Sequence, residues 1–343
     1  MVCKFDLKYN NYKILYLRSN LEEENNLERY IFSGSLTQLM HDKLIALPDF
    51  EPLDILVSQL DRSAINKMIE WKKEGFCRFL FIDSGAYSVH TGNAHITADE
   101  YIDYLNSIDE YIDVCAQLDK IPGTFRKPKS KQDYEESAKL SWENFLYMRT
   151  KMKSPNKLMP VMHQGESMDH LKMMLEWRDE TGRPLEWCGI SPSNDRSQKD
   201  KDIYLKQCED VIKASSNPDV KTHLYGMTSL ESLSKYKCYS ADSISHRLIA
   251  GYCKVYSPTF GVISVSKRHR TVAVKSNLSF LEVADEHNLE ILRKEAAECN
   301  MTLDDLAEDS VSRVVFTMHT IQKLMKTKYK YDPSNLRRSK KFF

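Results

Sequence analysis

The sequence has no excess of charge of either sign and no long apolar run. Lys and Arg total 49, and so do Asp and Glu, so the net charge does not indicate a polyanionic partner. No segment approaches the ~20 apolar residues that a membrane-spanning helix needs. The N-terminus, MVCKFDLKYN, lacks the apolar core of a signal peptide. The eight cysteines are scattered without a CxxC pair, which predicts reduced thiols in a cytoplasmic protein.

The sequence does contain a buried strand that ends abruptly in an acid. Phe79-Leu80-Phe81-Ile82 is a continuous apolar run, typical of a strand covered on both faces. Asp83-Ser84-Gly85 follows it directly. An acid at the carboxyl end of a buried strand, beside a residue that lets the backbone approach a ligand, is how α/β enzymes place chemistry. The structural alternative is that Asp83 only caps the next helix or shapes the turn.

Strand and helix alternate with short connections from residue 53 onward. This alternation predicts a parallel sheet with right-handed crossovers. A barrel of this kind needs about 250 residues, so the chain has room for further elements. The predicted fold class is α/β, a (β/α)8 TIM barrel with a C-terminal helical extension. The expected strands are 54–58, 78–83, 112–118, 158–162, 185–190, 221–225 and 239–241, with 261–265 as the eighth.

The predicted barrel divides the chain into three parts. Residues 1–50 are expected to supply N-terminal cap elements, with a candidate strand at 12–17. Residues 51–275 are expected to form the catalytic barrel, and residues 276–343 two C-terminal helices and a basic tail. The helices are expected to pack on the barrel; a helix-turn-helix reader of DNA is the alternative.

Six of the expected strands end in a polar residue or a glycine. In a barrel the carboxyl ends of all strands converge on one face, where such enzymes build their sites. One such residue would be weak support for a site, but six indicate an active face. These strand-end residues are Asp83, Asp119, Gln164, Gly189, Gly226 and Asp242.

The strand ends resemble those of a known family. DSGAYS at 83–88 is similar to the DSGGFQ motif of the tRNA-guanine transglycosylases, and QLDKIP at 117–122 is similar to their FDECTP. The resemblance covers residues 53–247 and keeps the family's order. The other matches are VMHQG at 161–165 (VQGG in the family), CGI at 188–190 (GGL), LYGM at 224–227 (LMGVG) and SADS at 240–243, where the family has its second essential aspartate.

The chain departs from that family after the last motif. The tRNA enzymes carry a CxCxxC…H zinc site there, whereas Cys253 and Cys299 stand alone, with His269 and His287 at the wrong spacing. The DSGAYS motif, the ADS form and the compact length are more similar to the 7-deazaguanine DNA transglycosylases of phages and bacterial modification islands. The resemblance thus implies a cytoplasmic enzyme, phage-encoded or bacterial, that replaces guanine in DNA with a 7-deazaguanine derivative and uses no cofactor and no metal.

The resemblance also implies a role for each strand-end residue. Asp242 would attack the sugar carbon as the nucleophile, and Asp83 would move protons on the leaving and incoming bases. Asp119 would accept from the N–H donors of a guanine-like edge, and Gln164 would read a carbonyl and a donor together. A salt bridge for Asp119 and a turn position for Gln164 are the structural alternatives. The remaining base-binding residues that the resemblance implies are Ser84, Gly85, Tyr87, Gly189 and Gly226.

Local clusters of positive charge favour a nucleic acid as the partner. One follows the Asp119 strand, a second lies near residue 268, and the segment 321–343 is also basic. A solvated face is the alternative for each cluster. A target base in duplex DNA would have to leave the stack to reach strand-end carboxylates. The residues expected to contact nucleic acid are Arg126, Lys127, Lys129, Lys131, Arg247, Lys267, Arg268 and Arg270.

Two other functions stay open at the level of sequence. A tRNA-guanine transglycosylase without the zinc site would keep the chemistry and act on tRNA. A non-catalytic nucleic-acid-binding subunit would need neither acid, and the presence of both Asp83 and Asp242 argues against it.

Overall fold

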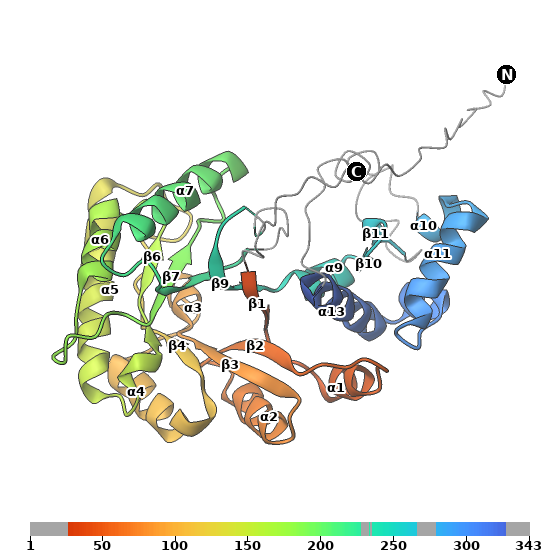
Figure 1. Ribbon diagram of the computed structural model, residues 1–343, viewed down its shortest axis with the longest axis horizontal. Helices are drawn as coiled ribbons and strands as arrows, with labels where there is room; N and C mark the ends of the chain where they lie inside the picture. The colour runs from red at the N-terminus through yellow and green to blue at the C-terminus, as the bar shows by residue number, and fades with distance from the viewer. Residues whose placement is uncertain (1–26, 228–232, 234, 266–278, 327–343) are drawn as a thin grey trace.

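A parallel sheet closes on itself to form a barrel (Figure 1). The computed structural model describes residues 27–227, 233, 235–265 and 279–326. The strands run in the order β5-β4-β3-β2-β1-β9-β8-β7-β6, and each of their pairings is parallel. Only Pro160 separates β5 from β6, and its carbonyl accepts from the N–H of Gly189 at 2.8 Å. Counted as one interrupted strand, β5 and β6 make this nine-strand sheet a closed (β/α)8 barrel, which confirms the predicted fold class.

The barrel strands are short, and helices surround them (Figure 1). The strands are β1 Leu27–Ser33, β2 Leu53–Ser58, β3 Cys77–Asp83, β4 Val114–Ala116, β5 Leu158–Met159, β6 Val161–His163, β7 Trp187–Ser191, β8 Lys221–Leu224 and β9 Cys238–Ser243. The helices of this part are α1 Gln38–Ile45, α2 Arg62–Lys73, α3 Ala86–His90, α4 Ala98–Ser107, α5 Lys131–Lys151, α6 Met168–Glu176 and α7 Gln198–Ala214, with single 3-10 turns at Asp109–Tyr111 and Pro155–Lys157.

The position of one barrel strand corrects the sequence prediction. Gly261–Ser264 is a strand, β11, but it pairs antiparallel with β10 (Lys254–Ser257) in a separate hairpin. The expectation that 261–265 closes the barrel is therefore wrong. β1 fills that place, hydrogen-bonded to β2 and β9, so residues 1–50 contain a barrel strand as well as α1. The candidate strand at 12–17 lies outside the described residues.

An ion-pair cluster closes the barrel at the amino ends of its strands. Asp54 is buried and accepts a two-pronged contact from Arg78, with both N–O distances 2.8 Å. Arg29 of β1 contacts the same carboxylate at 3.2 Å and lies over the Phe79 ring. Above this cluster the interior is apolar. Its buried members are Ile31, Leu56, Phe79, Phe81, Val114, Ala116, Met159, Val161 and Trp187.

The C-terminal helices lie on one side of the barrel, beyond β1 (Figure 1). The sequence predicts two helices here, and the structure divides them into four. They are α10 Phe280–Val283, α11 Glu286–Ala297, α12 Leu303–Glu308 and α13 Ser310–Lys326. α13 packs on α1, on β10 and on α9 (Ser245–Gly251). It is buried along 312–321, so it is a core element and not a free recognition helix. None of the described helices is long and apolar enough to cross a bilayer.

Candidate active site

Three aspartates come together at the carboxyl ends of the strands. Asp83 ends β3, Asp242 lies near the end of β9, and Asp119 follows β4. Burial, together with the charges of Asp119 and Asp242, raises the pKa of Asp83 to about 7. Ser84, the residue after Asp83, donates from its hydroxyl to Asp119 at 2.9 Å, so the ends of β3 and β4 lie side by side. A carboxyl with a pKa near 7 can hold or release a proton at neutral pH, as a general acid and base must.

The Asp242 carboxylate is held in place by donors on both of its oxygens. The N–H of Gly226 donates to Oδ1 at 2.9 Å, and the hydroxyl of Ser33 donates to Oδ2. His223 Nε2 lies 3.3 Å from Oδ1 but is not aligned for a hydrogen bond. Asp242 itself is 7% exposed. A carboxylate fixed in this way is oriented before any substrate arrives, which is what an attacking group requires.

Asp119 is the centre of a smaller hydrogen-bond group. Ser84 Oγ donates to its Oδ1 at 2.9 Å, and His163 Nε2 lies 2.8 Å from its Oδ2. Burial on its own would lower the pKa of His163, but the hydrogen bond and the charge of Asp119 outweigh burial and raise it. The structural alternative, a salt bridge of Asp119 to Lys120 or Arg126, is not found among the described residues; His163 takes that place. Each oxygen of Asp119 keeps a second lone pair for a ligand.

Gln164 is engaged by a neighbouring loop. Its Oε1 accepts from the N–H of Ser193 at 2.9 Å, and its Nε2 donates to the carbonyl of Asp200 at 3.1 Å. The amide therefore ties the loop after β7 to the end of β6. Each polar atom of Gln164 thus has one backbone partner, which leaves the amide one N–H and one lone pair for a ligand.

Two of the predicted glycines serve the protein itself. A Cβ on Gly85 would lie 2.9 Å from Leu60, and its φ of +78° is in the left-handed region; its N–H donates to Asp83 Oδ2 at 3.0 Å. A Cβ on Gly189 would lie 2.9 Å from the ring of Tyr225. Gly189 sits inside β7, not at its end, and it makes room for this side chain.

Tyr87 is exposed beside the three aspartates. It lies on α3, directly after the Asp83-Ser84-Gly85 turn, and 62% of its surface is accessible. Its ring centroid is 6.4 Å from that of Phe125, and the Arg126 guanidinium lies 5.0 Å from the Phe125 ring centre. Tyr87 is therefore not a core residue, and it belongs to an aromatic and cationic rim.

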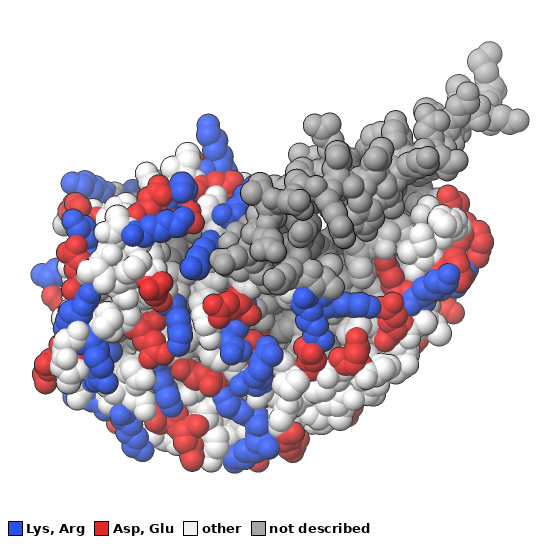
Figure 2. Space-filling model, in the orientation of Figure 1, with Lys and Arg blue, Asp and Glu red and all other residues white. Residues whose placement is uncertain are grey.

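The basic loop after β4 lies close to the Asp119 group. Burial lowers the pKa of His90, and the charges of Lys129, Lys120 and His163 lower it further. Lys129 is 3.9 Å from Asp195, and Lys131 is 3.1 Å from Glu135. For Arg126 and Lys127 the described residues supply no acidic partner. Figure 2 shows the charges of both signs interspersed over the visible face, so the basic loop is a local feature.

The Arg247 side chain lies next to Gly34, the residue after the Ser33 that bonds to Asp242. Its Nη1 is 3.0 Å from the place where a Cβ on Gly34 would stand, and Gly34 directly follows Ser33. The other predicted cluster of Lys267, Arg268 and Arg270 lies outside the described residues, as does most of the basic tail.

Three residues at this site carry no prediction from the sequence. Ser33 donates to Asp242, His223 lies beside Asp242, and the buried ring of Tyr225 stands edge-on to His223, with centroids 4.6 Å apart. Ser33 followed by Gly34 after an apolar run is a strand-end signal of the same kind as Asp83-Ser84-Gly85. His223 and Tyr225 alternate on one strand, and this spacing places both inside the barrel.

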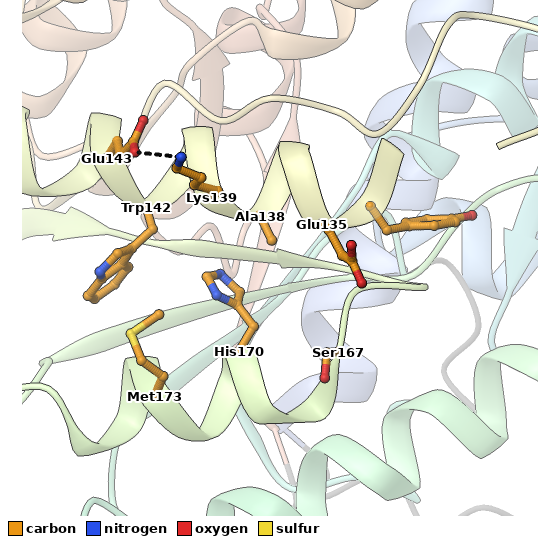
Figure 3. A pocket seen from close by; sticks show the side chains of 9 residues that line it. Glu135, Ala138, Lys139, Trp142, Glu143, Ser167, His170 and Met173 are labelled. Atoms are coloured by element: carbon orange, nitrogen blue, oxygen red, sulfur yellow. Dashed lines mark ion pairs between the residues drawn. The ribbon is translucent and has the colours of Figure 1, made fainter. Parts of the chain in front are cut away.

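A separate surface pocket lies between α5 and α6 (Figure 3). Trp142 of α5 and His170 and Met173 of α6 line it, together with the ion pair of Lys139 and Glu143. It belongs to the outer helical layer, and none of the three aspartates lines it. It is therefore distinct from the strand-end site.

No protein-family model matches this chain, and no curated protein does either. The resemblance carried by the six motifs thus remains a prediction. Within the described residues, no group of three or more His, Cys, Asp or Glu side chains is arranged to hold a metal ion.

Proposed function

We propose that this chain is a base-exchange transglycosylase that replaces guanine in DNA with a 7-deazaguanine derivative. The observation that carries the proposal is the pair of aspartates at one end of the barrel. Asp242 is buried and oriented by two donors, and Asp83 has a pKa raised to about 7. Different environments for two neighbouring carboxyls are the pattern of a nucleophile beside an acid–base group. The motif resemblance supplies the substrate class.

The proposed reaction has two displacement steps. Asp242 attacks C1′ of the target nucleotide, a C1′–O bond forms and the N-glycosidic bond breaks, while Asp83 supplies the proton that the departing guanine takes. The incoming base then loses its N9 proton to Asp83 and attacks C1′, which forms the new glycosidic bond and releases the Asp242 carboxylate. The proton that Asp83 gives in the first step is returned to it in the second.

The basic loop and the exposed rim favour a nucleic acid as the second substrate. Lys129 acts electrostatically on both His90 and His163, and Lys120 acts on His90, so positive charge lies near the histidine that contacts Asp119. Tyr87 offers an exposed aromatic face. Phosphate attraction together with an aromatic side chain that can stack on bases is the usual chemistry for holding an extruded or single-stranded nucleotide.

The direct test is base exchange with purified full-length protein. A labelled 7-deazaguanine base is offered with duplex DNA in one reaction and with bulk tRNA in another. We expect label in DNA, lost in Asp242→Ala and retained in the surface variant Asp169→Asn. Label in tRNA alone would move the proposal to a tRNA-guanine transglycosylase without the zinc site. Exchange that survives Asp242→Ala would overturn the assigned nucleophile, and label in neither polymer, with DNA binding intact, would favour a binding subunit.

A further inference from the structure

The carboxylate of Asp119 is held by two other strand ends. Ser84, directly after β3, donates from Oγ to its Oδ1 at 2.9 Å, and Nε2 of His163, the last residue of β6, lies 2.8 Å from its Oδ2. β4, which precedes Asp119, pairs with β3 on one side and with β5 on the other, and only Pro160 separates β5 from β6. The two contacts therefore fix the carboxylate at the carboxyl ends of the strands, where 8% of its side chain remains accessible.

The backbone of His163 is fixed as firmly as its ring. His163 is opposite Ser191 in the pairing of β6 with β7. Its N–H donates to Oε2 of Glu166 at 3.0 Å, and its carbonyl accepts from the N–H of Glu166 at 3.1 Å. The imidazole is thus attached to a strand end that is bonded on one side to a sheet and on the other to a closed turn. The position of Nε2 is set by this backbone and does not depend on Asp119 alone.

The imidazole donates in its contact with Asp119, because a carboxylate only accepts. Burial lowers the pKa of His163, but the hydrogen bond and the charge of Asp119 outweigh burial, so the pKa is raised. The charge of Glu166 also raises it, and the charge of Lys129 lowers it. Hydrogen bonds between an ionised donor and a carboxylate are shorter and about twice as strong as neutral ones. Of the two side chains that donate to Asp119, His163 is therefore the stronger, and the neutral Ser84 hydroxyl is the weaker.

The two donors leave Asp119 a defined capacity for a ligand. Each of its oxygens keeps a second lone pair, and both lone pairs lie in the plane of the carboxylate. The N1–H and the amino group of a guanine-type base are adjacent donors that such a pair of oxygens can accept together. Both bonds form only if the carboxylate plane matches the plane of the base, so a carboxylate that rotates freely binds the base more weakly.

We propose that His163 is a positioning residue whose Nε2–H fixes the plane of the Asp119 carboxylate, so that both Asp119 oxygens meet the N1–H and amino donors of the exchanged base. This inference rests on the proposed base exchange and adds a residue that acts on the base through Asp119. The bonds to this edge of the base are made before and during the displacement at C1′. Losing their alignment should therefore raise the KM for the base and leave kcat nearly unchanged.

The test compares two substitutions of His163 with a control. His163→Phe keeps a ring and removes the donor, whereas His163→Gln keeps an N–H donor near the position of Nε2 and removes the charge. The control is His170→Phe: His170 is half-buried on α6, edge-on to Trp142 at 6.3 Å, and lines the surface pocket and not the strand-end site. The KM for a labelled 7-deazaguanine base and kcat are measured on duplex DNA, below the unfolding midpoint of each protein. If His163→Phe does not fold, His163→Met, which is apolar and flexible, replaces it.

For His163→Phe we expect a KM for the base at least about 10-fold higher and a kcat within about 3-fold of the wild type. His163→Gln should restore the KM to within about 3-fold of the wild type, which a loss of packing alone would not allow. His170→Phe should leave both constants unchanged. A wild-type KM in His163→Phe, a KM in His163→Gln as high as in His163→Phe, or a loss confined to kcat would each overturn the positioning role, although exchange itself stands. If the wild-type protein exchanges no base with either polymer, the proposed function fails and takes this inference with it.

Discussion

Ser33 and Asp242 lie 209 positions apart in the sequence, and the Ser33 hydroxyl donates a hydrogen bond to Oδ2 of Asp242. The contact depends on the pairing of β1 with β9, in which Ile31 is opposite Asp242. Through this pairing, the N-terminal strand, which closes the barrel, also supplies part of the site. The position of the Asp242 carboxylate thus depends on barrel closure as well as on its own strand.

Ser33→Ala should slow base exchange about 10- to 100-fold, because a hydrogen bond to a charged group contributes about 1.5–3 kcal/mol. The loss should fall on kcat, since the bond orients the attacking oxygen. Ser137→Ala is the control: Ser137 is also buried and bonds to Glu166 at 3.3 Å, away from Asp242. Equal rates for the Ser33→Ala and wild-type proteins, measured as single-turnover exchange, would remove Ser33 from the site.

Asp83→Asn should abolish exchange and change how stability depends on pH. The carboxyl of Asp83 has a pKa of about 7 in the folded protein, against an ordinary pKa of 3.8 that applies in the unfolded chain. Between these values the folded state binds more protons, so the wild type loses stability as pH rises from about 4 to about 7. The variant lacks this loss. At pH 8 its free energy of unfolding should therefore rise, relative to that of the wild type, by at most about 4 kcal/mol. Denaturant unfolding at pH 4 and pH 8 measures it, and parallel pH profiles for the two proteins would contradict the raised pKa.

The strand-end acids could be predicted from sequence because each follows a local apolar run. Asp83 comes directly after the apolar run Phe79–Ile82. The alternation of strands and helices then predicts that the carboxyl ends of the strands lie at one face of the barrel. The sequence did not predict β1, because Arg29 occupies an inward position in this strand, where it pairs with Asp54 of β2. A charged residue at an inward position hides the pattern of a buried strand, and the pairing that justifies it is visible only in three dimensions.

The partners of the site residues could not be predicted for a similar reason. Ser33, His163 and Tyr225 contact residues far away in the sequence, so no spacing rule connects them. Gln164 has the residue type expected for reading a base, but its amide also bonds to Ser193 in the loop after β7 and to Asp200 at the start of α7. Residue type and strand position predict where the site lies. Which partner each of its polar side chains bonds to depends on contacts with segments far away in the sequence.

Asp54→Ala should destabilise the fold by about 3–5 kcal/mol, because it leaves Arg29 and Arg78 without the buried carboxylate that both contact. This cluster closes the end of the barrel opposite to the three aspartates. Base exchange measured well below the unfolding midpoint should therefore be unchanged. Asp61→Ala is the comparison: it removes only the helix cap at the N–H of Ala64 and should cost about 1 kcal/mol. Equal costs for the two variants in denaturant unfolding would show that the cluster contributes no more than a cap.

The double change Arg126→Ala and Lys127→Ala should weaken nucleic-acid binding without abolishing exchange at saturating substrate. If both side chains contact phosphates of duplex DNA, the slope of log K against log salt should become shallower by about 2. Lys172 and Lys206 lie on α6 and α7, where they pair with acidic residues, so Lys172→Ala with Lys206→Ala is the charge-matched control. Salt titrations of binding that give one slope for both double variants would exclude the basic loop from the interface.

His163→Gln should destabilise the protein more at pH 6 than at pH 9. Asp119 raises the pKa of His163 in the folded state, so the imidazolium pair contributes fully below the unfolded pKa of about 6.5 and is lost as pH rises through the folded pKa. His170 provides a control of opposite sign, because burial lowers its pKa. As pH falls below about 6.5, the unfolded chain protonates this histidine before the folded protein does, so the wild type loses stability. His170→Gln should therefore destabilise the protein less at acidic pH than at pH 9. Unfolding midpoints of both variants at the two pH values decide the matter. A His163 variant whose cost follows the His170 pattern would mean that burial, and not Asp119, governs this histidine.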